Sequence, residues 1–256
     1  MKALLISIVL TFSLVVKAQT ESIKDGSYHW SEFPVNFSED RETRSIIEGT
    51  SPHFEYLEIH ATTQYPGAKP NKPNANKDLE ELIIVKEGFM KVTIEGKSKI
   101  VGPESVILFL PNEVHSIENV GDSNLTYYIM SYRSKKPINF KRGLQNGGSM
   151  VYNAKNLTYK PSHKGGGVAY FDKATSMCER FEMHITELNR KGPSHNPHEH
   201  IETEIILVLS GNTEMMIDGK TYRGSAGDLY FANSELLHGI SNASDESCKY
   251  FAFKWN

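Results

Sequence analysis

Two histidines and a glutamate lie close together in the second half of the chain, at spacings that could build a metal site. They are His198, His200 and Glu204. If the segment after Pro197 forms a β-strand, alternate side chains share one face, and these three residues point the same way. Imidazole and carboxylate groups that converge on one point are ligand types for Mn, Zn, Fe, Ni or Co. His238, in a second strand-like segment, is the natural fourth ligand.

The alternative interpretation is an ordinary surface cluster of histidines. A buried Glu204 beside two imidazoles would be costly to desolvate without a positive partner, and a metal ion provides that charge. We therefore expect one divalent metal ion at this position. Mixed nitrogen and oxygen ligands with open positions do not distinguish Mn, Zn, Fe, Ni and Co from one another.

The spacing around these residues resembles the first sequence motif of the cupin family. Five residues separate Gly192 from His198, and six separate Glu204 from Gly211. Asn242, four residues after His238, resembles the end of the second cupin motif. The resemblance implies a metal ion held by three histidines and one glutamate on a small β-barrel. The chain departs from the second motif at residues 233–235, where Asn-Ser-Glu replaces the usual Pro-x-Gly, and this concerns loop conformation rather than ligation.

The second half of the chain repeats the first at an offset of 123 residues. The identical residues at this offset include Glu81, Gly88, Gly96, His115 and Asn119, which match Glu204, Gly211, Gly219, His238 and Asn242. Both copies consist of short β-rich runs separated by Gly, Asn and Asp, which is typical of a sandwich or barrel. The resemblance implies an all-β fold of two tandem cupin jelly-roll barrels, a bicupin.

At this offset the first copy lacks two of the four ligands. Ala75 and Lys77 align with the two histidines of the first motif, while Glu81 and His115 remain. Two ligands do not hold a divalent ion against water, so we expect no metal ion in the first barrel. Lys77 either places its ammonium group near Glu81 in place of the metal or is a solvated loop residue.

The predicted organisation begins with a segment that resembles a signal peptide, residues 1–18, in which Lys2 precedes an apolar run. The run is too short to span a bilayer. We expect an exported protein, periplasmic or secreted, without a membrane span. The remaining predicted parts are an N-terminal arm (19–44), the N-terminal cupin (45–135), a linker (136–164) and the C-terminal cupin (165–256). Exchange of the arm between two chains would produce a homodimer.

Charge and cysteine content exclude some classes of protein. The chain has 28 basic and 31 acidic residues and no Lys/Arg stripe, so no nucleic-acid partner is expected. The two cysteines, Cys178 and Cys248, either pair in an oxidising compartment or remain separate buried thiols.

Three further residues are candidates for catalysis or substrate binding. His195, three residues before His198, is either an acid/base group at the pocket or a plain loop histidine. In the last strand-like segment, Tyr250 and Lys254 share one face. If this face lines the pocket, Lys254 could bind an anionic group such as a carboxylate. If it faces solvent, Lys254 has no special role.

The expected function is metal-dependent, non-redox chemistry. A metal ion with open positions can bind a carboxylate or hydroxyl group and stabilise an enolate while a pocket base moves a proton. This favours a lyase, dehydratase or isomerase. Resemblance to small cupins that act on unsaturated uronates implies a sugar acid or a polysaccharide-derived oligosaccharide as substrate. Two alternatives remain open: a metal-dependent dioxygenase similar to quercetinase, and a non-catalytic sugar- or ligand-binding cupin.

Overall fold

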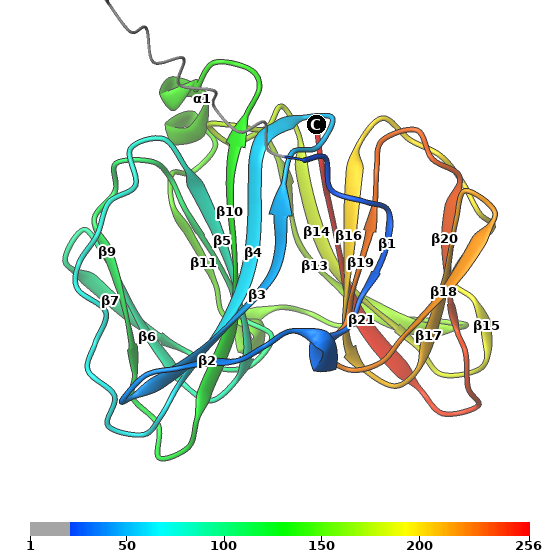
Figure 1. The fold of residues 1–256 in the computed structure, drawn as a ribbon, viewed down its shortest axis with the longest axis horizontal. Helices are drawn as coiled ribbons and strands as arrows, with labels where there is room; N and C mark the ends of the chain where they lie inside the picture. Colours follow the sequence, from blue (N-terminus) through cyan, green and yellow to red (C-terminus); the bar gives the residue numbers. More distant parts are fainter. Residues whose placement is uncertain (1–20) are drawn as a thin grey trace, which may run out of the picture.

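The computed structural model describes residues 21–256, which form two β-barrels side by side (Figure 1). The predicted all-β fold of two tandem barrels is confirmed: two seven-stranded sheets and two smaller sheets, of four and three strands, make up the barrels. The signal-like segment 1–18 lies outside the described residues. Among residues 21–256, no helix has the length and apolar character needed to cross a membrane.

The N-terminal barrel pairs a large sheet with a small one. The large sheet contains, in order across it, β11 (Met150–Tyr152), β8 (Val106–Phe109), β5 (Glu80–Glu87), β10 (Leu125–Ser134), β4 (Phe54–Gln64), β3 (Arg41–Gly49) and β2 (Asn36–Phe37). The small sheet contains β7 (Lys97–Val101), β6 (Met90–Ile94) and β9 (His115–Asn119).

The C-terminal barrel repeats this arrangement. Its large sheet contains β1 (Gly26–Tyr28), β19 (Leu229–Ala232), β16 (Thr203–Ser210), β21 (Cys248–Trp255), β14 (Phe181–Leu188), β13 (Gly165–Lys173) and β12 (Lys160–Ser162). Its small sheet contains β15 (Gly192–Pro193), β20 (His238–Asn242), β17 (Thr213–Ile217) and β18 (Lys220–Gly224). Asp218 and Gly219 both have positive φ, 48° and 75°, in the turn that joins β17 to β18. This is the turn that the Asp-Gly pair predicts for a tight hairpin.

The central strands are apolar on both faces because each face is buried in a different core. In β16, Ile205 and Leu207 belong to a core shared by the two barrels, whereas Ile206 and Val208 point into the C-terminal barrel. In β21 the shared core takes Phe251, Phe253 and Trp255, and the barrel interior takes Tyr250 and Ala252. The side-chain period of two therefore assigns alternate residues to the contact between barrels and to the pocket.

The two large sheets face each other across the shared core. Phe54 stacks on Trp255, with ring centroids 5.1 Å apart, and on Tyr132, at 4.6 Å. The Glu80 carboxylate is buried in the same region and accepts hydrogen bonds from Tyr132 Oη (2.8 Å), Thr175 Oγ1 (2.7 Å) and the Ser176 N–H (2.7 Å). Burial raises the pKa of Glu80, and these hydrogen bonds act in the opposite direction.

The segments predicted as arm and linker contribute strands to the barrels, so each barrel is larger than predicted. Within the arm (19–44), β1 lies beside β19 at the edge of the large C-terminal sheet. After η1 (Trp30–Glu32), β2 and the start of β3 belong to the large N-terminal sheet. Within the linker (136–164), β11 pairs with β8 and β12 with β13, around α1 (Phe140–Gln145) and η2 (Ala154–Asn156). Edge strands of two or three residues are too short to show a period in the sequence.

The two cysteines remain separate. Cys178 and Cys248 are both buried and unpaired, which is the second of the two predicted alternatives. Burial raises the pKa of both thiols, that of Cys248 to about 11.

Candidate metal centre

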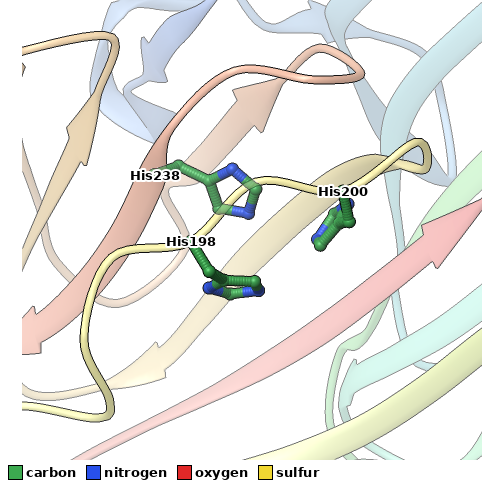
Figure 2. A group of neighbouring side chains, drawn as sticks. All are labelled: His198, His200 and His238. Carbon is green, nitrogen blue, oxygen red and sulfur yellow. The ribbon is translucent and has the colours of Figure 1, made fainter.

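Three histidines of the C-terminal barrel meet around one space (Figure 2). One ring nitrogen from each of His198, His200 and His238 lies within 4.8 Å of the other two. His198 and His200 come from the segment before β16, and His238 is the first residue of β20. The backbone N–H and C=O groups of His198 and His238 exchange two hydrogen bonds of 2.9 Å. This bridge holds the segment that carries the first two histidines against β20.

Glu204, near the start of β16, completes the predicted set. Its Oε2 atom lies 2.8 Å from His238 Nε2 and 3.7 Å from His200 Nε2. The four predicted ligand side chains therefore lie together, from two segments far apart in the sequence. Their role as metal ligands remains a prediction.

Backbone hydrogen bonds orient two of the imidazole rings. His200 Nδ1 lies 3.0 Å from the Glu202 carbonyl oxygen, and His238 Nδ1 lies 2.7 Å from that of Leu236. Each Nδ1 therefore donates its proton to a carbonyl and leaves the lone pair of Nε2 directed at the cluster. The buried Nε2 of His200 has no hydrogen-bond partner. The 2.8 Å contact between His238 Nε2 and Glu204 requires a proton or a metal cation between two acceptors. This donor set fits a divalent metal ion.

The charges of the cluster shift its pKa values in opposite directions. Burial opposes ionisation of Glu204, but the neighbouring imidazoles of His200 and His238, the second of them hydrogen-bonded to the carboxylate, outweigh it and lower the pKa of the carboxyl group. Burial also lowers the pKa of His238, but the bonded Glu204 carboxylate outweighs it, so that this pKa is raised. Burial and the neighbouring histidines lower the pKa of His198, which favours its neutral, ligating form.

A cavity of about 170 Å³ opens beside the cluster. Apolar side chains form part of its lining: Ile206, Met215, Ile240 and Ala252. The polar side chains of the lining are those of the predicted ligands His198, Glu204 and His238 and those of His184, Thr186, Ser194, His195, Tyr250 and Lys254. A larger groove, of about 450 Å³, lies on the same barrel around His29 and Asp228, but it is wide open and the histidine cluster does not line it. We therefore identify the site by its side chains rather than by volume.

The remaining predicted site residues lie at this cavity. Tyr250 and Lys254 share the face of β21 that lines it, and Lys254 Nζ lies 3.6 Å from Glu182 Oε2. His195 is exposed, with its ring centroid 4.5 Å from that of His198 and its Nδ1 2.8 Å from the Asn196 carbonyl oxygen. The roles of His195, Tyr250 and Lys254 remain predictions.

A charged group that was not predicted from the sequence lies beside the cavity. Arg180 pairs with three carboxylates, those of Asp172 (2.8 Å), Glu182 (2.5 Å) and Glu202 (2.7 Å). Glu182 in turn lies 3.3 Å from His184 Nδ1. Arg180, Glu182 and His184 alternate along a strand-like segment, and this pattern predicts that their side chains share one face.

The structure corrects the alignment of the two copies at the ligand positions. In the N-terminal barrel, Asn74 exchanges backbone hydrogen bonds with His115, as His198 does with His238. Asn74 therefore occupies the place of His198, and Ala75 does not. The gapless offset failed here because the N-terminal copy has one extra residue before Glu81.

A second backbone hydrogen bond confirms the corrected alignment. The Asn112 N–H donates to the Asn76 carbonyl oxygen, as the Glu235 N–H donates to that of His200, each at 2.7 Å. Two asparagines therefore stand where the C-terminal barrel has two histidines. An amide side chain offers divalent transition metals a weaker ligand than imidazole.

The rest of the N-terminal site is closed by protein groups. Lys77 is exposed, and Glu81 pairs with His115 at 3.0 Å, so of the two alternatives for Lys77 the structure shows the second, an exposed loop residue. The Phe109 ring stacks on His115, with centroids 3.8 Å apart, at the position that Ala232 occupies in the C-terminal barrel. Within residues 21–256, three side chains lie close enough together to hold a metal ion, and they are those of the C-terminal histidine cluster.

Comparison with protein-family models matches the cupin domain family in both barrels, at residues 62–131 and 184–254. Comparison with curated protein sequences gives no match.

Solved structures share the fold at low sequence identity. AerE from Microcystis aeruginosa has a TM-score of 0.69 and 12% identity, with 91% of this chain and 100% of AerE covered. Oxalate decarboxylase of Lactobacillus farciminis, in complex with formate, has a TM-score of 0.70 and 14% identity, covering 91% and 86%. Oxalate decarboxylase of Bacillus subtilis, which has Mn(II) centres, has a TM-score of 0.68 and 14% identity, covering 97% and 84%. At these identities the likeness concerns the fold alone.

Proposed function

Because this chain belongs to the cupin domain family, we propose that its C-terminal barrel holds one divalent metal ion and carries out non-redox chemistry on a small anionic substrate. The reaction class is that of a lyase, dehydratase or isomerase acting on a sugar acid in carbohydrate breakdown. The observation that carries this proposal is one cavity lined by Lys254 and by two members of the histidine cluster, His198 and His238.

The volume of the cavity supports a small substrate. Clefts for drug-sized ligands measure about 300–1,000 Å³, whereas this cavity measures about 170 Å³. A single sugar acid fits this size better than an oligosaccharide, which would have to extend past His195 into solvent. The polar lining residues Thr186, Ser194 and Tyr250 offer hydroxyl groups to the hydroxyls of such a substrate.

Each part of the lining has a separate task. His198, His200, Glu204 and His238 would hold the metal ion, and Mn, Zn, Fe, Ni and Co all suit these ligands. When bound, such an ion supplies Lewis-acid stabilisation of negative charge that develops on the substrate oxygen. Lys254 binds the substrate carboxylate by a charge-assisted hydrogen bond. The B. subtilis oxalate decarboxylase, which has Mn(II) centres, supports testing Mn first.

The proposal is tested by comparing a sugar acid with its neutral sugar. We expect the metal-loaded protein to bind D-galacturonate and not D-galactose, in isothermal titration calorimetry. Lys254→Met should weaken binding of the acid about 10- to 100-fold, because a hydrogen bond to a charged group is worth about 1.5–3 kcal/mol. Lys249→Met is the matched control on the same strand, because Lys249 pairs with Glu104 at 2.9 Å and does not line the cavity.

Two results would contradict the proposal. Equal binding of acid and neutral sugar by the loaded protein would leave no role for Lys254, and a non-catalytic sugar-binding cupin would then be favoured. Consumption of O₂ with an Fe- or Cu-loaded protein would favour the dioxygenase alternative. Conversion of the acid is followed in the same samples by NMR. Export to a periplasm or to the medium, and assembly as a homodimer, remain predictions.

A further inference from the structure

The cavity contains a histidine that belongs neither to the metal cluster nor to the segment around it. His184 lies in the middle of β14, in the large sheet, and lines the cavity together with Lys254 of the adjacent strand β21. The metal-binding histidines come instead from β20 and from the segment before β16. A substrate in the cavity would therefore contact His184 and the metal cluster through different strands.

Glu182 orients this histidine. His184 Nδ1 lies 3.3 Å from Glu182 Oε1, so Nε2 is the nitrogen left to meet a substrate. The Glu182 carboxylate is itself held, because Arg180 lies 2.5 Å and Lys254 Nζ 3.6 Å from its Oε2 atom. The pKa of Glu182 is lowered to about 2, chiefly by the hydrogen bond to His184, with Lys254 and Arg180 acting in the same direction against the effect of burial. The carboxylate therefore stays ionised beside the imidazole.

The N-terminal barrel contains the same pair in different surroundings. On β4, Glu58 Oε1 lies 3.1 Å from His60 Nδ1, in the arrangement of Glu182 and His184. There Ile129 occupies the place of Ala252, and Phe109 covers His115. The chain thus offers two copies of one Glu-x-His pair, of which the C-terminal copy lines an open cavity beside metal ligands.

We propose that His184, held by Glu182, is the group that moves a proton in this cavity, and this inference rests on the function proposed above. His184 Nε2 takes the proton from the carbon next to the substrate carboxylate, and the C–H electron pair forms the enolate. The proton then returns to the same carbon or to a neighbouring one in an isomerisation. In a dehydration it goes to the leaving hydroxyl group, which departs as water. His184 is the catalytic residue of this step and Glu182 the positioning residue.

Exchange of hydrogen with D₂O tests this step without requiring the natural product. Metal-loaded protein is incubated with D-galacturonate, D-gluconate or L-malate in D₂O, and loss of the proton on the carbon next to the carboxylate is followed by NMR, with the exchange of protein-free samples subtracted. His184→Gln should lower the exchange rate at least about 100-fold, the usual contribution of general acid–base catalysis. Glu182→Gln should lower the rate at saturating acid about tenfold, without raising the half-saturating concentration.

Matched variants separate the possible outcomes. His60→Gln, at the equivalent pair of the N-terminal barrel, should exchange at the wild-type rate. Metal content and circular dichroism confirm that each variant folds, and Glu182→Gln carries the test if His184→Gln does not fold. Wild-type exchange in His184→Gln, with loss in His195→Gln, would overturn the role of His184 and leave the proposed function standing. No exchange of any of the three acids by the metal-loaded wild type would overturn both.

Discussion

Replacing His198 and His200 together by asparagine should lower the affinity of the protein for a divalent metal ion by at least about 1,000-fold. The substitution gives the C-terminal barrel the residues that the N-terminal barrel has at the same places, Asn74 and Asn76. The outer partners of metal ligands alone are worth about 10- to 100-fold in affinity, so the loss of two ligands should exceed that range. Competition with a chromophoric chelator measures the change.

A matched variant in the other barrel shows that the effect belongs to one site. Changing Asn74 and Asn76 to alanine should leave the affinity unchanged, because Phe109 stacks on His115 there and Glu81 pairs with the same histidine. An affinity within tenfold of wild type in the His198/His200 variant would mean that the metal binds elsewhere.

Removing the metal with EDTA should lower the melting temperature by about 5–10 °C. A ligand present at about 100 times its Kd stabilises the folded state by about 2.7 kcal/mol, and each kcal/mol shifts the Tm of a chain of this size by about 2–4 °C. Metal-loaded and EDTA-treated samples are compared by calorimetry at pH 8. The His198/His200 double asparagine variant should show no difference between the two samples.

The difference in Tm should shrink as the pH falls. The raised pKa of His238 means that this histidine keeps its proton to a higher pH than usual, and the metal must displace that proton. In the metal-free protein, the same raised pKa contributes stability that is fully present below the unfolded-state pKa and lost as the pH rises through the folded-state pKa. Both effects bring the two melting temperatures together in acid. A difference that grows at lower pH would contradict the assignment of His238 as a ligand.

The repeat and the ligand spacing were enough to predict the fold and the position of the cluster. The ligand spacing identified His198, His200 and Glu204 correctly as neighbours, but the strand expected after Pro197 begins only at Thr203, so strand alternation does not orient the two histidines. The repeat of Glu204 and His238 at Glu81 and His115 predicted two barrels. A single sequence carries such spacing, together with the side-chain period of its longer strands. The two faces of β21 followed from the same period, since Phe251 packs in the shared core and Lys254 lines the cavity.

Features that depend on packing could not be predicted in this way. One extra residue in a loop moved the N-terminal ligand positions to Asn74 and Asn76, and a gapless comparison cannot detect such a shift. Phe109 covers the site in the N-terminal barrel, and the small Ala232 at the equivalent position leaves the C-terminal site open. This difference is recognised only once the pairing of the strands is known. His184 lies outside both ligand motifs, and its pairing with Glu182 is one of many that strand alternation permits.

The N-terminal barrel has a structural task even without a metal. Its large sheet covers the face of the C-terminal sheet that carries Phe253 and Trp255, which would otherwise expose a large apolar surface to water. Because β21 carries both this face and the cavity-lining Lys254, the contact between barrels also holds one wall of the site in place.

The most direct test is the metal content of the untagged protein, measured by plasma mass spectrometry after loading with Mn or Zn and removal of free metal. One equivalent per chain, lost in the His198/His200 double asparagine variant and retained in His115→Ala, is the predicted result. Two equivalents would mean that the N-terminal barrel also binds metal despite Asn74 and Asn76. No bound metal after loading would contradict the proposal that these histidines form a metal centre.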